Sequence, residues 1–260
     1  MNQPTPAIVS QSAARRLPRA ALLLLCLAYL LPGLIARAPW KSADMASFGY
    51  MLELARGNTG WMDPRLMGLR PEADGLLPYW LGAWAIQIST AWLEPAMAAR
   101  LPFFLLLALA MGGTWCAAFN LARSPRAQPV AFAFGGEALP SDYARAIADG
   151  AVLALIACLG LAQLSHEITT SVAQLAFTAL SFLALAALQN RPRGAGVALG
   201  AGLLGLTFSG APSLAAFFGL GGALLHLVCA VPEGVGPRSR WRAVVIVLVA
   251  TLLAAFLAWR

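Results

Sequence analysis

The stretch LPFFLLLALAMGGTWCAAF, residues 101–119, holds no charged side chain and is long enough to cross a bilayer as a helix. Further apolar runs lie before and after it, at residues 20–36, 151–164, 168–188, 195–208, 214–231 and 243–259. Runs of this kind are typical of membrane-spanning helices, whose backbone polar groups are satisfied internally. The sequence therefore predicts an all-α fold, a polytopic transmembrane helical bundle with about seven spans in a single domain over residues 1–260.

The composition also favours a membrane protein. Hydrophobic residues make up 60% of the 260 positions, charged residues only 11%, and the mean hydropathy is +0.72, whereas soluble domains carry about 25% charged residues. The net charge of +7 comes almost wholly from arginine, since Lys41 is the only lysine. Basic runs with interleaved aromatic residues are missing, so we expect no nucleic-acid partner. The four cysteines lie in or beside apolar runs without CxxC spacing, which favours packing roles.

The distribution of arginine predicts the topology. Arg15, Arg16 and Arg19 precede the first apolar run, which places the N-terminus in the cytoplasm of a bacterial-type inner (plasma) membrane. That run lacks a small-residue cleavage site, so we expect an uncleaved first span of a multi-pass protein. Residues 37–100 then form a periplasmic loop, and residues 120–150 form a cytoplasmic loop.

Residues 78–94, PYWLGAWAIQISTAWLE, are apolar enough to enter the membrane, and arginine counting decides whether they cross it. If they do not cross, eight later arginines lie in the cytoplasm: Arg123, Arg126, Arg145, Arg191, Arg193, Arg238, Arg240 and Arg242. If they cross, all eight face outward, against the positive-inside rule. We therefore expect an interfacial helix rich in Trp and Tyr.

A second interfacial helix is predicted in the periplasmic loop over residues 42–56, with Ser42 as its N-cap and Gly57 at its end. Its apolar stripe at helical spacing consists of Phe48, Met51, Leu52 and Ala55. Asp44 lies in the first turn, where the helix dipole favours a carboxylate, so ordinary capping is the simplest role for this acid. In the cytoplasmic loop, a short helix is expected at residues 141–150, separate from the span that follows.

The periplasmic loop resembles a known family. It contains, in order, Pro39-Trp40, Asp44 and then Phe48 four residues later. GWMDPRLMG follows at residues 60–68, PYWLGA at 78–83 and EPAMAARLPFFLLLAL at 94–109. This spaced series resembles the polyprenyl-phosphate-sugar glycosyltransferases of the GT-C superfamily, such as aminoarabinose transferases and protein mannosyltransferases. The resemblance covers roughly residues 22–188, and the chain is short for that family, so we expect the N-terminal membrane part of a longer architecture.

The resemblance implies sugar transfer from a polyprenyl-phosphate donor to a lipid, glycan or protein hydroxyl of the cell envelope, at the periplasmic face. In that family the acid after the first span is the catalytic base or a metal carboxylate, and here it is Asp44. The resemblance further implies that nearby arginines hold the donor phosphate and that the Y-W-L motif contacts substrate. The implied substrate-binding residues are Arg56, Arg65, Arg70, Tyr79, Trp80 and Glu167, the last replacing a second acid of the family. The cofactor is left open, with a divalent metal on Asp44 and Asp74 as one option.

The chain departs from the family pattern at two positions. Met45 stands where the family usually has a glutamate, and Asp74 stands where a lysine usually meets the donor phosphate. These departures keep a second hypothesis open, a non-catalytic membrane protein on a GT-C-like scaffold that binds lipids or serves as an assembly partner. A transporter ranks last, because the sequence has no inverted repeat and few intramembrane charges. The loop arginines and Glu167 also have simpler readings, as interfacial anchors and as a polar residue at a membrane boundary.

Overall fold

The regular secondary structure of the described residues is helical. The structure is a computed structural model that describes residues 8–35, 38–72, 75–89, 92–188, 191–228 and 237–259, and no β-strand occurs in these ranges. The all-α prediction is confirmed. The helices are α1 (Arg19–Leu30), η1 (Leu31–Gly33), α2 (Ser42–Ala55), α3 (Leu77–Ser89), α4 (Pro95–Ala122), η2 (Pro125–Ala127), α5 (Pro140–Ile156), α6 (Leu159–Leu164), α7 (Thr170–Ala187), α8 (Pro192–Phe208), α9 (Pro212–Val228) and α10 (Pro237–Trp259).

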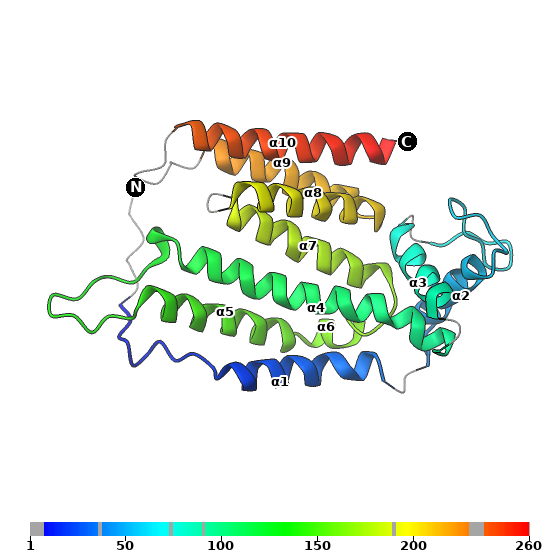
Figure 1. Ribbon diagram of the computed structural model, residues 1–260, viewed down its shortest axis with the longest axis horizontal. Helices are drawn as coiled ribbons and strands as arrows, with labels where there is room; N and C mark the ends of the chain where they lie inside the picture. Colours follow the sequence, from blue (N-terminus) through cyan, green and yellow to red (C-terminus); the bar gives the residue numbers. More distant parts are fainter. Residues whose placement is uncertain are drawn as a thin grey trace.

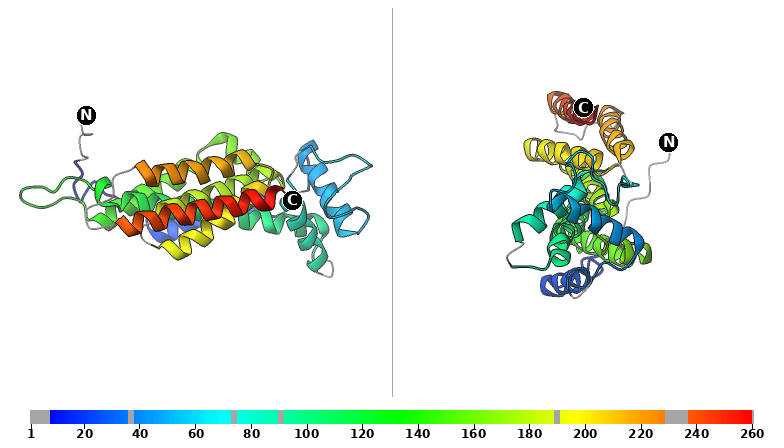
Figure 2. Two further views of the ribbon diagram at one scale, coloured as in Figure 1. Left: turned by 90° about the horizontal axis from the view of Figure 1, so that it is seen from above. Right: turned by 90° about the vertical axis from the view of Figure 1, so that its right-hand side faces the viewer.

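The long helices lie side by side in a bundle with α4 near its centre (Figure 1). Helix α4 packs against α7 on one side and against α5 on the other, while α7 continues the stack to α8, which in turn contacts α9 and α10. Helices α2 and α3 pack against each other beyond one end of the bundle, where α3 also contacts α4. Figure 2 shows the same arrangement from above and from that end. The bundle therefore carries a small helical layer at one end only.

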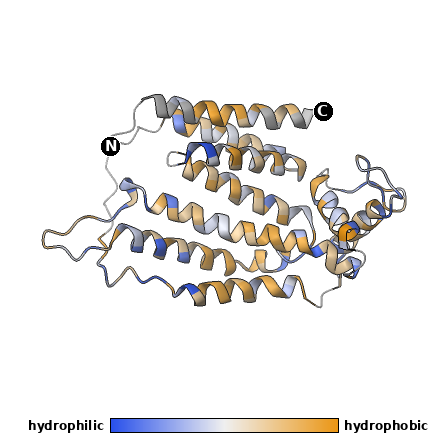
Figure 3. Cartoon of the chain, in the orientation of Figure 1, coloured by the Kyte–Doolittle hydropathy of each residue, from blue (hydrophilic) through white to orange (hydrophobic). Residues whose placement is uncertain are grey.

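The buried side chains form two apolar clusters. The first includes Met51 of α2, Ala83 of α3 and Phe103 of α4, and it joins the end layer to the bundle. The second includes Leu203 of α8 and Val247 of α10. Hydrophobic residues, orange in Figure 3, run along all the long helices of the bundle. Many large apolar side chains are exposed. Examples on α1, α9 and α10 are Leu23, Leu24, Phe217, Leu220, Leu224, Val249 and Leu252.

Apart from the run at 151–164, the predicted apolar runs correspond to helices with small shifts at their ends. Runs 101–119 and 168–188 lie in α4 and α7, and by length and composition these two helices can cross a membrane. The runs at 20–36 and 214–231 correspond to the shorter apolar helices α1 with η1 and α9. The helices predicted at residues 42–56 and 78–94 are also present, as α2 and α3, although α3 ends earlier than its prediction.

The predicted separation between a short helix at residues 141–150 and a span at residues 151–164 is wrong. Helix α5 begins at Pro140 and continues through Gly150, and the break comes later, between Ile156 and Leu159. A glycine inside a helix costs about 1 kcal/mol relative to alanine. Buried Ala148 and Val152 on either side of Gly150 hold the helix against its neighbours and offset that cost.

The buried face of α2 also differs from the predicted stripe. Its buried residues are Asp44, Ser47, Tyr50, Met51 and Leu54, so the buried face includes a charged residue and only Met51 of the predicted stripe. Ser42 is the first residue of the helix, and the N-cap is Lys41, without a side-chain hydrogen bond. Helix α3 approaches this face so closely that a Cβ on Gly82 would lie 2.2 Å from Met51 Sδ. The buried face of α2 thus combines Tyr50, Met51 and Leu54 with Asp44, whose carboxylate pairs with Arg100.

Candidate functional site at the end of the bundle

Asp44 is completely buried and both of its carboxylate oxygens are engaged. Oδ2 accepts a charge-assisted hydrogen bond from Nη2 of Arg100 at 3.2 Å, and Oδ1 accepts the backbone N–H of Ile168 at 2.8 Å. The carboxylate therefore connects α2 to the first turns of α4 and to the segment that leads into α7. Its contacts reach across the fold, which corrects the expectation of a simple capping role within its own helix.

Arg100 completes the connection between the end layer and the bundle. Its side chain is 1% exposed, and Nη1 donates to the carbonyl oxygen of Gly33 at 3.3 Å, at the end of η1. A buried ion pair gains little net stability over apolar packing, but the loss of one partner leaves an uncompensated buried charge. The Asp44–Arg100 pair thus fixes how α1, α2, α4 and α7 meet.

A second buried acid lies beside the first. Glu167 precedes Ile168, whose amide binds Asp44, and its side chain is 4% exposed. Its Oε1 accepts a hydrogen bond from Gln163 at 3.3 Å and lies 3.8 Å from Nζ of Lys41. The structure therefore brings together two predicted site residues, Asp44 and Glu167, from positions 123 residues apart in the sequence.

His166 closes the space between α1 and this cluster. Its Nε2 lies 2.7 Å from the carbonyl oxygen of Tyr29, and its Nδ1 lies 2.7 Å from that of Ala162. A Cβ on Gly33 would lie 2.5 Å from the imidazole ring, so glycine is needed there for close packing. The cavity left beside Arg100 and His166 measures only about 10 Å³, enough for about one water molecule.

The three predicted phosphate-binding arginines pair with acids of their own loop. Arg65 and Arg70 both reach Asp63, at 2.8 and 2.9 Å, and the hydrogen bond from Arg65 holds the pKa of that carboxyl below its ordinary value. Arg56 lies 4.0 Å from Glu53 at the far end of α2, about 18 Å along the helix axis from Asp44. The structure does not gather these arginines around Asp44.

Tyr79 and Trp80 connect α3 to its surroundings. The Tyr79 ring is buried and lies 5.6 Å from the ring of Tyr50 on α2. Trp80 donates its indole N–H to the carbonyl oxygen of Trp61 at 2.7 Å, and its ring lies 6.3 Å from that of Phe208. Both side chains thus hold the end layer together and join it to the bundle.

The donor set around Asp44 does not fit the implied divalent metal. Both oxygens already accept hydrogen bonds, and the Arg100 guanidinium lies where a cation would bind the carboxylate. The described residues contain no group of three or more His, Cys, Asp or Glu side chains arranged to hold a metal ion. Asp74, the second implied ligand, lies outside the described residues.

Sequence reasoning missed Arg100 and Lys41 as members of this cluster. Arg100 follows an alanine pair at the head of a long apolar helix, and a charged side chain in such a position is a signal for a buried partner. Lys41 is the only lysine of the chain and lies three residues before Asp44. Either feature pointed to a cation near the acids.

Comparison with known proteins gives no match, whether to a family model, to a curated protein or to a solved structure.

We expect Asp44→Asn to cost about 3–5 kcal/mol of stability, because it keeps the acceptor for Ile168 but leaves the Arg100 cation buried without its counter-ion. The double variant Asp44→Asn, Arg100→Met removes both charges and is expected to recover most of this loss. Thermal unfolding of the purified protein, followed by tryptophan fluorescence, measures the loss in the single variant and the recovery in the double variant. Equal destabilisation of the single and double variants would show that the pair does not fix the fold.

Burial raises the pKa of Tyr79 to about 12 from an ordinary value of 10.0, and nearby Tyr50 adds to the shift. Because the folded state favours the protonated phenol, this contribution to stability is complete below about pH 10 and is lost as the pH rises toward 12. The unfolding midpoint of Tyr79→Phe should therefore fall less steeply over this range than that of the wild type. Tyr143→Phe, in α5, is the matched control, and equal slopes for Tyr79→Phe and wild type would contradict the prediction.

Proposed function

We propose that this protein is a multi-pass protein of a bacterial-type inner membrane, with a cytoplasmic N-terminus and the α2–α3 layer at the periplasmic face. The apolar outer faces of α1, α9 and α10 support a lipid environment, since large exposed apolar surfaces are rare on soluble monomers. Arg123 and Arg126 follow α4, at the opposite end of that helix from Arg100. This asymmetry suits the positive-inside rule.

Within that membrane, we propose that the protein transfers a sugar from a polyprenyl-phosphate donor to a hydroxyl of a lipid, glycan or protein acceptor. One observation carries the proposal: two buried acids, each beside a cation, meet at the proposed periplasmic end. They are Asp44 with Arg100, and Glu167 with Lys41. Buried ionisable groups in membrane proteins are costly and are typical of functional sites.

The chemistry follows from the charges of the pair. When the guanidinium of Arg100 moves from the carboxylate to the donor phosphate, it stabilises the negative charge that develops on the leaving phosphate oxygen. Asp44 is then free to accept the proton of the acceptor hydroxyl. The acceptor oxygen bonds to the anomeric carbon as the bond to the phosphate oxygen breaks, and polyprenyl phosphate leaves. No metal takes part in these steps.

A second candidate function is a non-catalytic protein on the same scaffold. The observation that favours it is the closure of the site, because Asp44 is fully buried and the adjacent cavity has only about 10 Å³, whereas ligand pockets have roughly 300–1,000 Å³. Catalysis requires the site to open, whereas a structural role for the pair does not. The two candidates therefore differ in what happens when the pair is replaced without loss of the fold.

The variant Asp44→Asn, Arg100→Met separates the two candidates, because it is expected to stay folded while it lacks the base. Sugar transfer in membranes of a strain that lacks the gene should fall at least about 100-fold if Asp44 is the base. Asp63→Asn is the control, since it removes an acid of the same loop that also pairs with arginines. Undiminished transfer by the double variant would exclude Asp44 as the base, and absence of transfer by the wild type would favour the scaffold.

The proposed topology predicts that α3 lies at the interface and does not cross the membrane. Reporters fused at Glu72, before α3, and at Ser124, after α4, should then lie on opposite sides, with Glu72 outside. Each position is fused separately to alkaline phosphatase, which is active only outside the cytoplasm, and to green fluorescent protein, which fluoresces only inside it. The two fusions at one position should therefore give opposite signals, and each serves as the control for the other. A cytoplasmic Glu72 would refute both the topology and the periplasmic site.

A further inference from the structure

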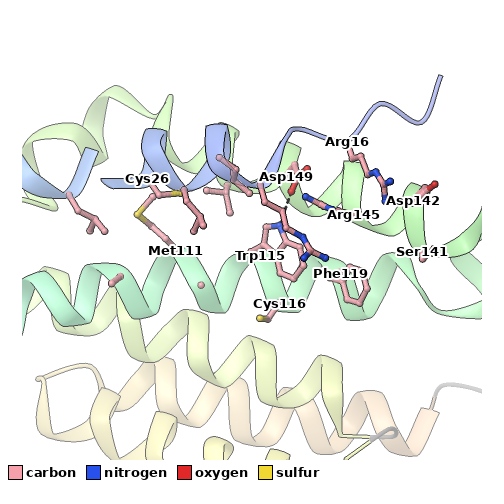
Figure 4. A pocket seen from close by; sticks show the side chains of 17 residues that line it. Arg16, Cys26, Met111, Trp115, Cys116, Phe119, Ser141, Asp142, Arg145 and Asp149 are labelled. Carbon is pink, nitrogen blue, oxygen red and sulfur yellow. Dashed lines mark hydrogen bonds and ion pairs between the residues drawn. The ribbon is translucent and has the colours of Figure 1, made fainter. Parts of the chain in front are cut away.

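A cavity of about 660 Å³ lies between α1, α4 and α5, toward the end of α4 that is distant from Arg100 (Figure 4). Its volume is within the range of small-molecule and cofactor pockets, roughly 300–1,000 Å³. Leu23 at its edge is 67% exposed, so the cavity reaches the outer surface of the bundle. We call it the α1–α4–α5 groove.

One part of the groove is an apolar channel. Leu22, Cys26 and Leu30 of α1 are spaced four residues apart, so they follow one another along a single face for about 12 Å. Met111 and Phe119 of α4 line the opposite wall. An extended apolar wall of this kind suits a hydrocarbon chain.

The other part of the groove is lined by arginines. Arg16 lies in the segment before α1, Arg19 is the first residue of α1, and Arg145 comes from α5. Arg16 pairs with Asp142 at 2.9 Å, while Arg145 uses Nη2 to donate to the carbonyl oxygen of Leu17 at 3.2 Å. Arg19 lies exposed in the first turn of α1.

The two acids of the groove are held by contacts within the protein. Asp149 is buried, and its oxygens accept hydrogen bonds from the Trp115 indole at 2.9 Å and from the Leu17 amide at 3.0 Å. Asp142 accepts from Arg16 and from Gln11, each at 2.9 Å. Three arginines and two aspartates leave the groove with a net charge of +1, which complements a ligand with one negative charge.

We propose that the α1–α4–α5 groove binds one anionic phospholipid of the surrounding bilayer, with its phosphate among Arg16, Arg19 and Arg145 and an acyl chain along the α1 and α4 walls. Basic pockets between helices on the cytoplasmic side of a membrane bind anionic lipid headgroups in this way. The inference rests on the membrane topology proposed above and is independent of sugar transfer.

Gly112 offers a direct test, because it lines the groove and a Cβ added to it meets open space. Gly112→Leu therefore fills the groove without a backbone clash. Gly221→Leu, on α9 and also with open space around its Cβ, is the matched control outside the groove. The full chain is equilibrated with phosphatidylglycerol or phosphatidylcholine in detergent, and the retained lipid is counted by native mass spectrometry.

We expect wild type and Gly221→Leu to retain phosphatidylglycerol in preference to phosphatidylcholine, and Gly112→Leu to bind it about tenfold more weakly. Arg19→Gln, at an exposed position that does not threaten the fold, should lower the affinity for phosphatidylglycerol about fivefold and leave phosphatidylcholine unchanged. Equal retention of the two lipids by wild type, or unchanged phosphatidylglycerol binding by Arg19→Gln, would overturn the proposal. The variant Asp44→Asn, Arg100→Met should retain lipid as wild type does, so failure of the sugar-transfer proposal is distinguishable from failure of this one.

Discussion

The Asp44 carboxylate accepts hydrogen bonds from a side chain of α4 and from the backbone just before α7, and it is fully buried. A buried carboxylate is costly unless it is paired and hydrogen-bonded, so these three segments are stable only when they meet in one arrangement. Arg100 extends the arrangement to Gly33, at the end of the first helix. The apolar contacts between α2 and α3, such as Met51 against Gly82, then hold the rest of the end layer in place.

Much of the helical organisation was predictable, because a long apolar run satisfies its backbone polar groups internally when it forms a helix. The runs that became α4 and α7 needed no tertiary information, and the helix at residues 42–55 followed from its position and spacing. The buried face of α2 differs from the predicted stripe, because it shares only Met51 with that stripe and includes Asp44, which pairs with Arg100. The predicted helix end at Gly150 was wrong, because the low helix propensity of glycine is outweighed by the packing of its neighbours along α5.

The candidate site was partly predictable. Acids are rare in this chain, so Asp44 and Glu167 were easy to single out, and the structure brings them together. Their cations were missed, because the pairing of Asp44 with Arg100 spans 56 positions and a single sequence does not reveal it. The loop arginines were attractive because of their proximity in sequence, yet Arg65 and Arg70 have an acid within seven residues and pair with it. Arg65 and Arg70 thus pair with the nearby carboxylate of Asp63 and not with the more distant carboxylate of Asp44.

Helix α4 also sets the distance between two features of the fold. Its axis rises about 28 Å between Arg100, which holds Asp44, and Phe119 in the wall of the groove. The hydrocarbon core of a bilayer is about 30 Å thick. One unbroken helix thus holds the buried ion pair and a wall of the groove at a separation close to that thickness, which suits the membrane topology that we propose. An insertion or deletion within α4 between these two positions would change their separation by about 1.5 Å per residue and turn one of them about the helix axis relative to the other.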